Sequence, residues 1–142
     1  MQRKVPTPKK TCIDLEVIQS QAFWDLTGIS LKVYIIFLMK RVFSNTSLRK
    51  RKEKVVVNNG EITYTFKEAC KNHKIPKSTF LRARDQLIKV GLIEIAEYGG
   101  NHHTNKYTIS QNWKNYPEQT FERPKSGNLV GMKTRWTSNK NV

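Results

Sequence analysis

The segment KSTFLRARDQLIK (77–89) carries polar side chains that are mostly hydrogen-bond donors or cations, with Asp85 as its one acid. Between them Phe80, Ala83 and Leu87 recur at the spacing of a single helical face. The spacing predicts a helix that buries its apolar side in a core and presents donors on the other side. Donors arranged in this way can bind phosphate groups and the polar edges of bases.

The charge of the whole chain also points to a polyanionic partner. Its 142 residues contain 26 Lys+Arg against 11 Asp+Glu, a formal net charge of +15. Such an imbalance destabilises a compact fold by self-repulsion, and a negatively charged partner relieves it. A solvated basic surface without a partner, or a ribosome-type protein, is the alternative.

Capping signals predict a shorter helix before the segment 77–89. Thr65 precedes Glu68 by the spacing of a capping box, so a helix is expected over about 66–73. Pro76 then forces the residue before it out of helical geometry and makes a tight turn. The next helix is expected over 78–90, with Ser78 as its cap, and to stop at Gly91.

Further segments complete the expected order of elements. TGISLKVYIIFLMKRVF (27–43) predicts a core helix capped by Thr27 or Ser30, and SQAFWDL upstream predicts a short helix packed on the same core. Asn59-Gly60 predicts a short hairpin, and LIEIAEYGG and NKYTIS predict two strands around a turn. The apolar stripe expected on the core helix is Leu31, Tyr34, Ile35, Leu38, Met39 and Val42.

GEITYTFKEACKNHKIPKSTFLRARDQLIKVGLIEIAE resembles winged-helix DNA-binding domains, in particular those of phage and plasmid replication-initiation proteins and related prokaryotic regulators. The likeness covers about residues 25–112, and it rests on the Ser-Thr-apolar start of the second helix and its Leu-x-x-x-Gly-Leu-Ile exit, Leu87 to Ile93. It implies an α+β fold, a three-helix core with a β-hairpin wing. It also implies that the helix from 78 enters the major groove while the wing contacts the minor groove or the backbone.

The candidate DNA-binding residues come from three places. The helix contributes Lys77, Ser78, Thr79, Arg82, Arg84, Gln86 and Lys89, and the hairpin turn contributes His102, His103, Asn105 and Lys106. The basic link before Asn59-Gly60 contributes Arg49, Lys50, Arg51 and Lys52 as backbone contacts. A solvated loop is the alternative for the link.

Three regions are expected along the chain: a flexible basic arm over 1–12, the winged-helix domain over 13–116, and a basic tail without fixed structure over 117–142. Trp113 and Tyr116 are expected to close the core as a structural cover, with stacking on bases as the alternative.

No catalytic or metal-binding constellation is evident, so we expect neither enzymatic activity nor a cofactor. The carboxylates are scattered, and His102-His103 has no further ligand nearby in the sequence. Cys12 and Cys70 predict reduced thiols in a cytoplasmic protein. No apolar run is long enough to span a membrane.

The sequence therefore predicts a cytoplasmic protein that binds double-stranded DNA sequence-specifically, in replication initiation or transcription regulation. The alternative is a winged-helix adaptor that docks replication or regulatory proteins, and an RNA-binding protein is a third reading. Replication and transcription remain equally compatible with the sequence, as do a monomer and a homodimer.

Overall fold

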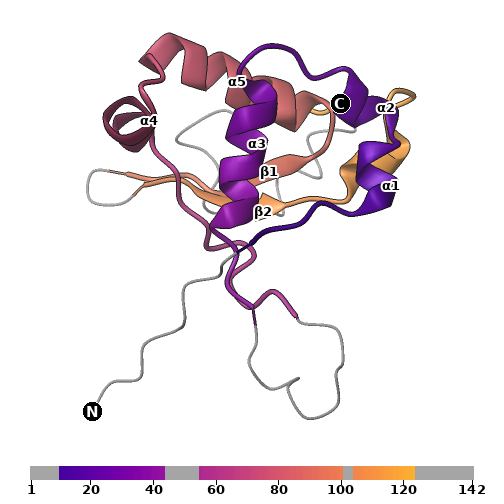
Figure 1. Ribbon diagram of the computed structural model, residues 1–142, viewed down its shortest axis with the longest axis horizontal. Helices are drawn as coiled ribbons and strands as arrows, with labels where there is room; N and C mark the ends of the chain where they lie inside the picture. The colour runs from indigo at the N-terminus through magenta and orange to yellow at the C-terminus, as the bar shows by residue number, and fades with distance from the viewer. Residues whose placement is uncertain (1–9, 44–54, 101–103, 124–142) are drawn as a thin grey trace, which may run out of the picture.

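The computed structural model describes residues 10–43, 55–100 and 104–123 of the chain. These residues form a mixed α+β fold, with five α-helices, one 3-10 helix and a two-stranded antiparallel sheet (Figure 1). The elements are α1 (Leu15–Ile18), α2 (Gln21–Trp24), α3 (Ser30–Met39), α4 (Phe66–His73), α5 (Lys77–Lys89), β1 (Ile93–Glu97), β2 (Lys106–Ile109) and η1 (Asn112–Asn115). This α+β class was expected, and the order of elements is compatible with a winged helix.

The predicted α4 and the turn after it are confirmed. The Thr65 side chain accepts a hydrogen bond from the Glu68 amide at 3.0 Å, as the capping-box spacing indicated. Lys74 ends α4 in the left-handed region with φ 59°, and Ile75 is buried below the turn. The cap expected for α5 was wrong: Pro76 occupies the N-cap position and Ser78 lies inside the first turn.

Helix α3 is shorter than expected, and only Tyr34 and Leu38 of the expected inner stripe are buried. Its N-cap is Ile29, without a side-chain hydrogen bond, so neither Thr27 nor Ser30 caps it. The residues it buries are Ser30, Val33, Tyr34, Phe37 and Leu38, whereas Met39, expected on the inner stripe, is exposed. Because α3 is apolar on nearly all sides, its periodicity did not define one inner face.

The two strands after α5 pair as expected, but Asn59-Gly60 does not close a local hairpin. β1 and β2 pair antiparallel, with Ile93 opposite Ile109. Ile62 instead forms an isolated bridge to Tyr107, and the Asn59 side chain bonds both the amide and the carbonyl of Ile109. The segment around Ile62 is therefore attached to the edge of the sheet at β2.

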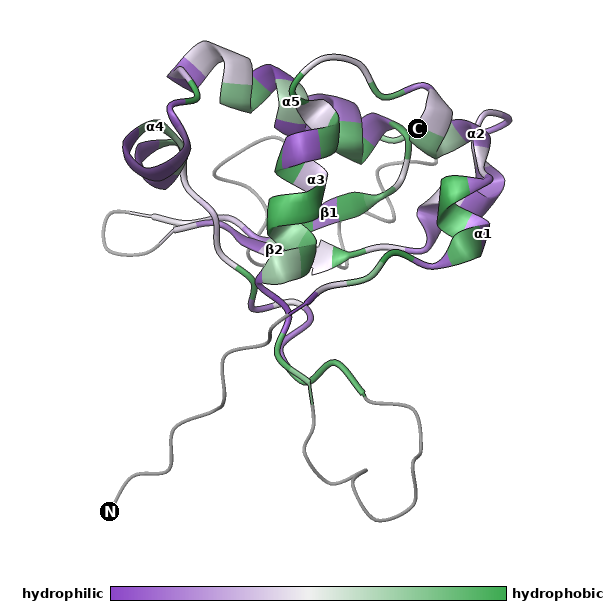
Figure 2. Ribbon diagram, viewed as in Figure 1, coloured by the Kyte–Doolittle hydropathy of each residue, from purple (hydrophilic) through white to green (hydrophobic). Residues whose placement is uncertain are grey.

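A cluster of aromatic rings forms the centre of the core. The Phe37 ring lies edge-on to Tyr64 and Tyr107, with centroids 5.4 and 4.9 Å away. Phe80 of α5 meets Tyr64 in the same way at 5.0 Å. Figure 2 shows that α3 is mostly hydrophobic, while α4 is mostly hydrophilic. Edge-to-face pairs of this kind add to the free energy gained by burial.

Two segments extend or close the fold. Residues 40–43 and 55–58 pair below α3 through a Phe43–Val56 bridge. The side chain of Asn58 strengthens this pairing, because its oxygen accepts a hydrogen bond from the Val42 backbone amide and its nitrogen donates to the Lys40 carbonyl. Residues 111–123, which we call the C-terminal strap, pack on the core through Trp113 and Phe121. Part of the strap, 117–123, lies in the region expected to lack fixed structure.

In the described ranges none of the helices has the length and apolarity needed to cross a membrane. Trp24, which was expected to pack on the core, is 69% exposed on α2, whereas Phe23 and Leu26 do pack there.

Gly91 provides a test of how the strap and α5 are joined. A Cβ at Gly91 would lie 2.6 Å from the backbone of Asn112 and Trp113, and its φ is +88°. Gly91→Ala should therefore lower the free energy of unfolding by roughly 1–3 kcal/mol through overpacking, in addition to backbone strain. Denaturant unfolding measures this.

Gly28→Ala is the matched control, since Gly28 also has positive φ (+54°) but nothing within 4 Å of the added Cβ. Gly28→Ala should lower the free energy of unfolding only by the cost of the strained backbone. Equal losses of stability in the two variants would show that the close approach at Gly91 is unimportant.

Candidate nucleic-acid interface

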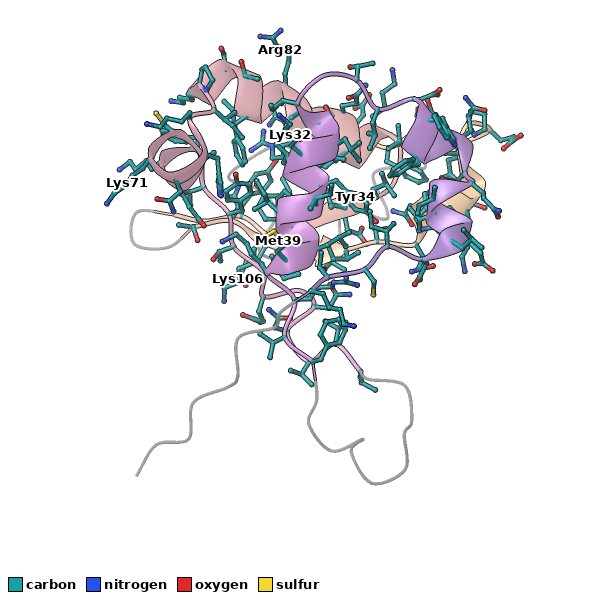
Figure 3. All side chains as sticks on the ribbon, in the orientation of Figure 1. Lys32, Tyr34, Met39, Lys71, Arg82 and Lys106 are labelled. Carbon is teal, nitrogen blue, oxygen red and sulfur yellow. The ribbon has the colours of Figure 1, made fainter. Side chains whose placement is uncertain are left out.

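Helix α5 presents a row of polar side chains on the side away from the core. We call it the α5 row, and its members are Ser78, Arg82, Asp85 and Lys89. Ser78, Arg82 and Lys89 are exposed, and Asp85 lies between them half-buried. Positions 78, 82, 85 and 89 fall within about 60° of one another around a helix with 100° per residue. Figure 3 shows the Arg82 side chain projecting outward from the top of the molecule. The side chains of Arg82, Ser78 and Lys89 make no hydrogen bond or ion pair with other described residues.

The N-terminal end of this row is partly held by α4. The Lys77 Nζ atom lies 4.4 Å from the centroid of the Phe66 ring, a cation–π contact that keeps the charge at the start of α5. No side chain caps α5, so its first amide groups have no side-chain acceptor. Thr79, the remaining candidate in this turn, is half-buried.

Two candidates on α5 have their side chains engaged in contacts within the protein. Arg84 is only 8% exposed, and its Nε and Nη2 atoms donate to Asp85 at 3.2 and 3.1 Å. Gln86 donates to the Asp25 carbonyl and accepts from the Thr27 amide, which ties α5 to the link between α2 and α3. In this fold the side chains of Arg84 and Gln86 both make internal contacts, and their role as DNA contacts stays a prediction.

The hairpin candidates are also engaged internally where they are described. The Asn105 side chain accepts a hydrogen bond from the Gly99 amide at 2.7 Å and so joins the two arms of the hairpin. Lys106 lies 3.0 Å from Glu61, and hydrogen bonding to this carboxylate, together with its charge, raises the pKa of Lys106. His102 and His103 lie outside the described residues.

The described segments on either side of the basic link lie at the other end of the molecule from the row on α5 (Figure 1). Arg49, Lys50, Arg51 and Lys52 are outside the described residues, but the paired segments that flank them are not. These segments leave from the lower end of α3, beyond Met39, whereas Arg82 projects from the top (Figures 1 and 3). The fold therefore does not bring the flanks of the link to the α5 row.

The C-terminal strap reaches the α5 row from the side, which the sequence analysis missed. The Phe121 amide donates to the Lys89 carbonyl at 3.1 Å, and the Arg123 Nε atom lies 3.3 Å from Asp85 Oδ1. A hydrogen bond to Tyr98, then the charge of Asp85, raise the pKa of Arg123. An open hollow of about 430 Å³ lies between Asp85, Lys89 and residues 120–123. Phe121, one apolar residue in a polar stretch, was the signal for this attachment.

Trp113 and Tyr116 hold the strap in place, in agreement with the structural role favoured for them. Trp113 is buried, and the Tyr116 hydroxyl donates to Asp25 Oδ2 at 2.6 Å. Hydrogen bonds from Tyr116 and Gln21 lower the pKa of Asp25 below its ordinary value of 3.8. The same bond to Asp25 raises the pKa of Tyr116 above its ordinary value of 10.0.

A second hollow separates α5 from the hairpin. It measures about 200 Å³ and is lined by residues of the α4 start, α5 and the hairpin, among them Phe66, Arg84 and Asn105. Cys12 and Cys70 are free and exposed. Within the part of the chain that the structure describes, no group of three or more His, Cys, Asp or Glu side chains could hold a metal ion.

Comparisons with protein-family models, curated proteins and solved structures found no match to this chain.

The hydrogen bond between Tyr116 and Asp25 makes a pH-dependent prediction. Because the pKa of Asp25 is lowered in the fold, its stabilisation is complete above about pH 3.8 and is lost as the pH falls through the lowered value. The Tyr116 contribution is lost only as the pH rises above about 10. Tyr116→Phe should therefore lower the Tm at pH 7, with the difference from the original chain shrinking below pH 3.8.

Tyr34→Phe is the control for this prediction. The pKa of Tyr34 is raised to about 12, chiefly by burial rather than by an acidic partner. Its effect on Tm should not change between pH 7 and pH 3. A Tyr116→Phe difference that also stays constant over this range would contradict the role given to Asp25.

Proposed function

We propose that this protein is a winged-helix protein that binds double-stranded DNA sequence-specifically, with α5 in the major groove. Replication initiation and transcription regulation are the processes that such a reader serves. One observation carries the proposal: Ser78, Arg82 and Lys89 form an exposed row on a helix whose opposite face is fixed in the core. A helix held in this way presents donors to base edges with little loss of conformational entropy.

The surroundings of α5 support the same orientation. The turn between α4 and α5 is short and its Lys74 is left-handed, an arrangement typical of a helix-turn-helix pair. The antiparallel β1–β2 hairpin follows α5 directly, in the position of a wing. The net charge of +15 supplies a nonspecific attraction for the phosphate backbone.

The placement of the charges refines the proposal. The internal partners of Arg84, Gln86 and Asn105 leave Lys77, Ser78, Thr79, Arg82 and Lys89 as the contacts on α5. Arg82 is the side chain with the geometry for a bidentate contact to guanine O6 and N7. Lys77 and Lys89 lie at the two ends of α5 and are the phosphate contacts of the proposal.

A second candidate function, a protein-interaction module, is favoured by a different surface. Met39, Val55 and Val57 are 54–62% exposed near the paired segments below α3. Exposed apolar groups gathered in one region are typical of protein interfaces. Met39 lies at the lower end of α3, whereas Arg82 projects from the top of the molecule, so the two functions would use different faces (Figure 3).

Selection from a randomised pool of DNA duplexes at about 150 mM salt tests the proposal, and we expect one motif to be enriched. Arg82→Ala should then weaken binding to the selected duplex by roughly 1–3 kcal/mol and relax one base position. Lys32→Ala removes the same charge from an exposed position of α3 and is the matched control. It should change affinity for all duplexes by a similar small amount.

Two outcomes would count against the proposal. Binding without enrichment, lost steeply with salt, would indicate a purely electrostatic binder. Equal effects of Arg82→Ala and Lys32→Ala on the selected duplex would remove α5 from the interface and favour the protein-interaction module.

A further inference from the structure

The acid in the middle of the α5 row needs an explanation, because a carboxylate facing DNA repels phosphate. Asp85 is 45% exposed and lies between Arg82 and Lys89 on the outer face. Neither of these neighbours is within ion-pair distance of it in the described structure. The two cations that Asp85 does contact are Arg84, the preceding residue on α5, and Arg123 of the C-terminal strap.

Two arginines hold one oxygen of this carboxylate. Arg84 donates twice to Asp85 Oδ1, and Arg123 of the C-terminal strap lies 3.3 Å from the same oxygen. Two guanidinium groups thus compensate a single negative charge. The local repulsion of phosphate is therefore small, and the carboxylate is held in one orientation.

The second oxygen, Oδ2, accepts no hydrogen bond from the described residues. An ionised carboxylate can only accept hydrogen bonds, so its partner must be a donor. In the major groove the base donors are the amino groups of cytosine and adenine. Adenine also presents its N7 acceptor beside that amino group and would repel a carboxylate, whereas cytosine presents only the amino group.

We propose that Asp85 reads a cytosine through Oδ2, and that Arg123 is the positioning residue that fixes Asp85 for this contact. The inference rests on the proposed function, since it requires α5 to lie in the major groove. It also gives the C-terminal strap a role beyond closing the core. Arg123 of the strap offsets the negative charge of Asp85, which would otherwise repel the DNA phosphates.

The experiment compares duplexes that differ only at one base pair of the selected motif. The original chain should prefer cytosine at one position by about 10- to 100-fold over the other bases. Asp85→Asn should abolish that preference, and since an amide matches the N6 and N7 groups of adenine, it should shift the preference toward adenine. Asp85→Ala should lose the cytosine preference without gaining a preference for another base. If one of the two variants fails to fold, the other still tests the contact.

Arg123 is tested at the same base position. Arg123→Gln should reduce the cytosine preference severalfold, and Arg123→Lys should restore part of it because the charge returns. Lys89→Gln is the matched control on the same face of α5. It should weaken binding to all of these duplexes alike and leave the base preference intact.

The outcomes separate this inference from the proposed function. A motif that keeps the same cytosine preference in Asp85→Asn and Asp85→Ala would overturn the inference and leave sequence-specific binding standing. If Arg123→Gln acted no differently from Lys89→Gln, the positioning role of the strap would be wrong. Failure of the original chain to select any motif would overturn both.

Discussion

The contacts among Phe37, Tyr64, Phe80 and Tyr107 are the interaction on which the rest of the domain depends. These rings come from α3, the segment before α4, α5 and β2, so their packing brings together elements distant in the sequence. All four side chains are almost completely buried. Because the inner face of α5 is fixed by this cluster, its outer face has a defined direction, and the α5 row can act as a rigid binding surface.

The distribution of charge within this frame is as informative as the net charge. Lys40 is paired with Glu68, Lys106 with Glu61, and Arg84 and Arg123 with Asp85. These ion pairs decide which cations remain available to a partner. On α5 the available ones are those of the α5 row, which is why that surface, rather than total charge, carries the functional argument.

Local signals in the sequence predicted the elements that depend on neighbouring residues. The Thr65–Glu68 spacing, Pro76 and Gly91 located α4, the turn and the end of α5 to within a residue or so. The inner face of α3 could not be predicted, because a helix apolar on nearly all sides has no unique stripe.

The candidate site was predictable only in part, because the partners of its side chains depend on the tertiary fold. Helical periodicity placed Ser78, Arg82 and Lys89 outward, as the structure has them. It did not show that Gln86 reaches Asp25 across 61 positions or that Arg123 returns to Asp85, since both contacts depend on the tertiary fold. Periodicity reports which side of a helix is polar, whereas the partner of each polar side chain depends on which distant segment lies beside it.

The most direct test of DNA binding through α5 is to follow the NMR chemical shifts of the backbone amides in the full chain as a selected duplex is added at about 150 mM salt. We expect the largest changes at the outward positions of α5, including Arg82, with smaller changes in the β1–β2 hairpin. Changes confined to Met39, Val55 and Val57, with α5 unaffected, would contradict binding through α5 and place the binding surface below α3.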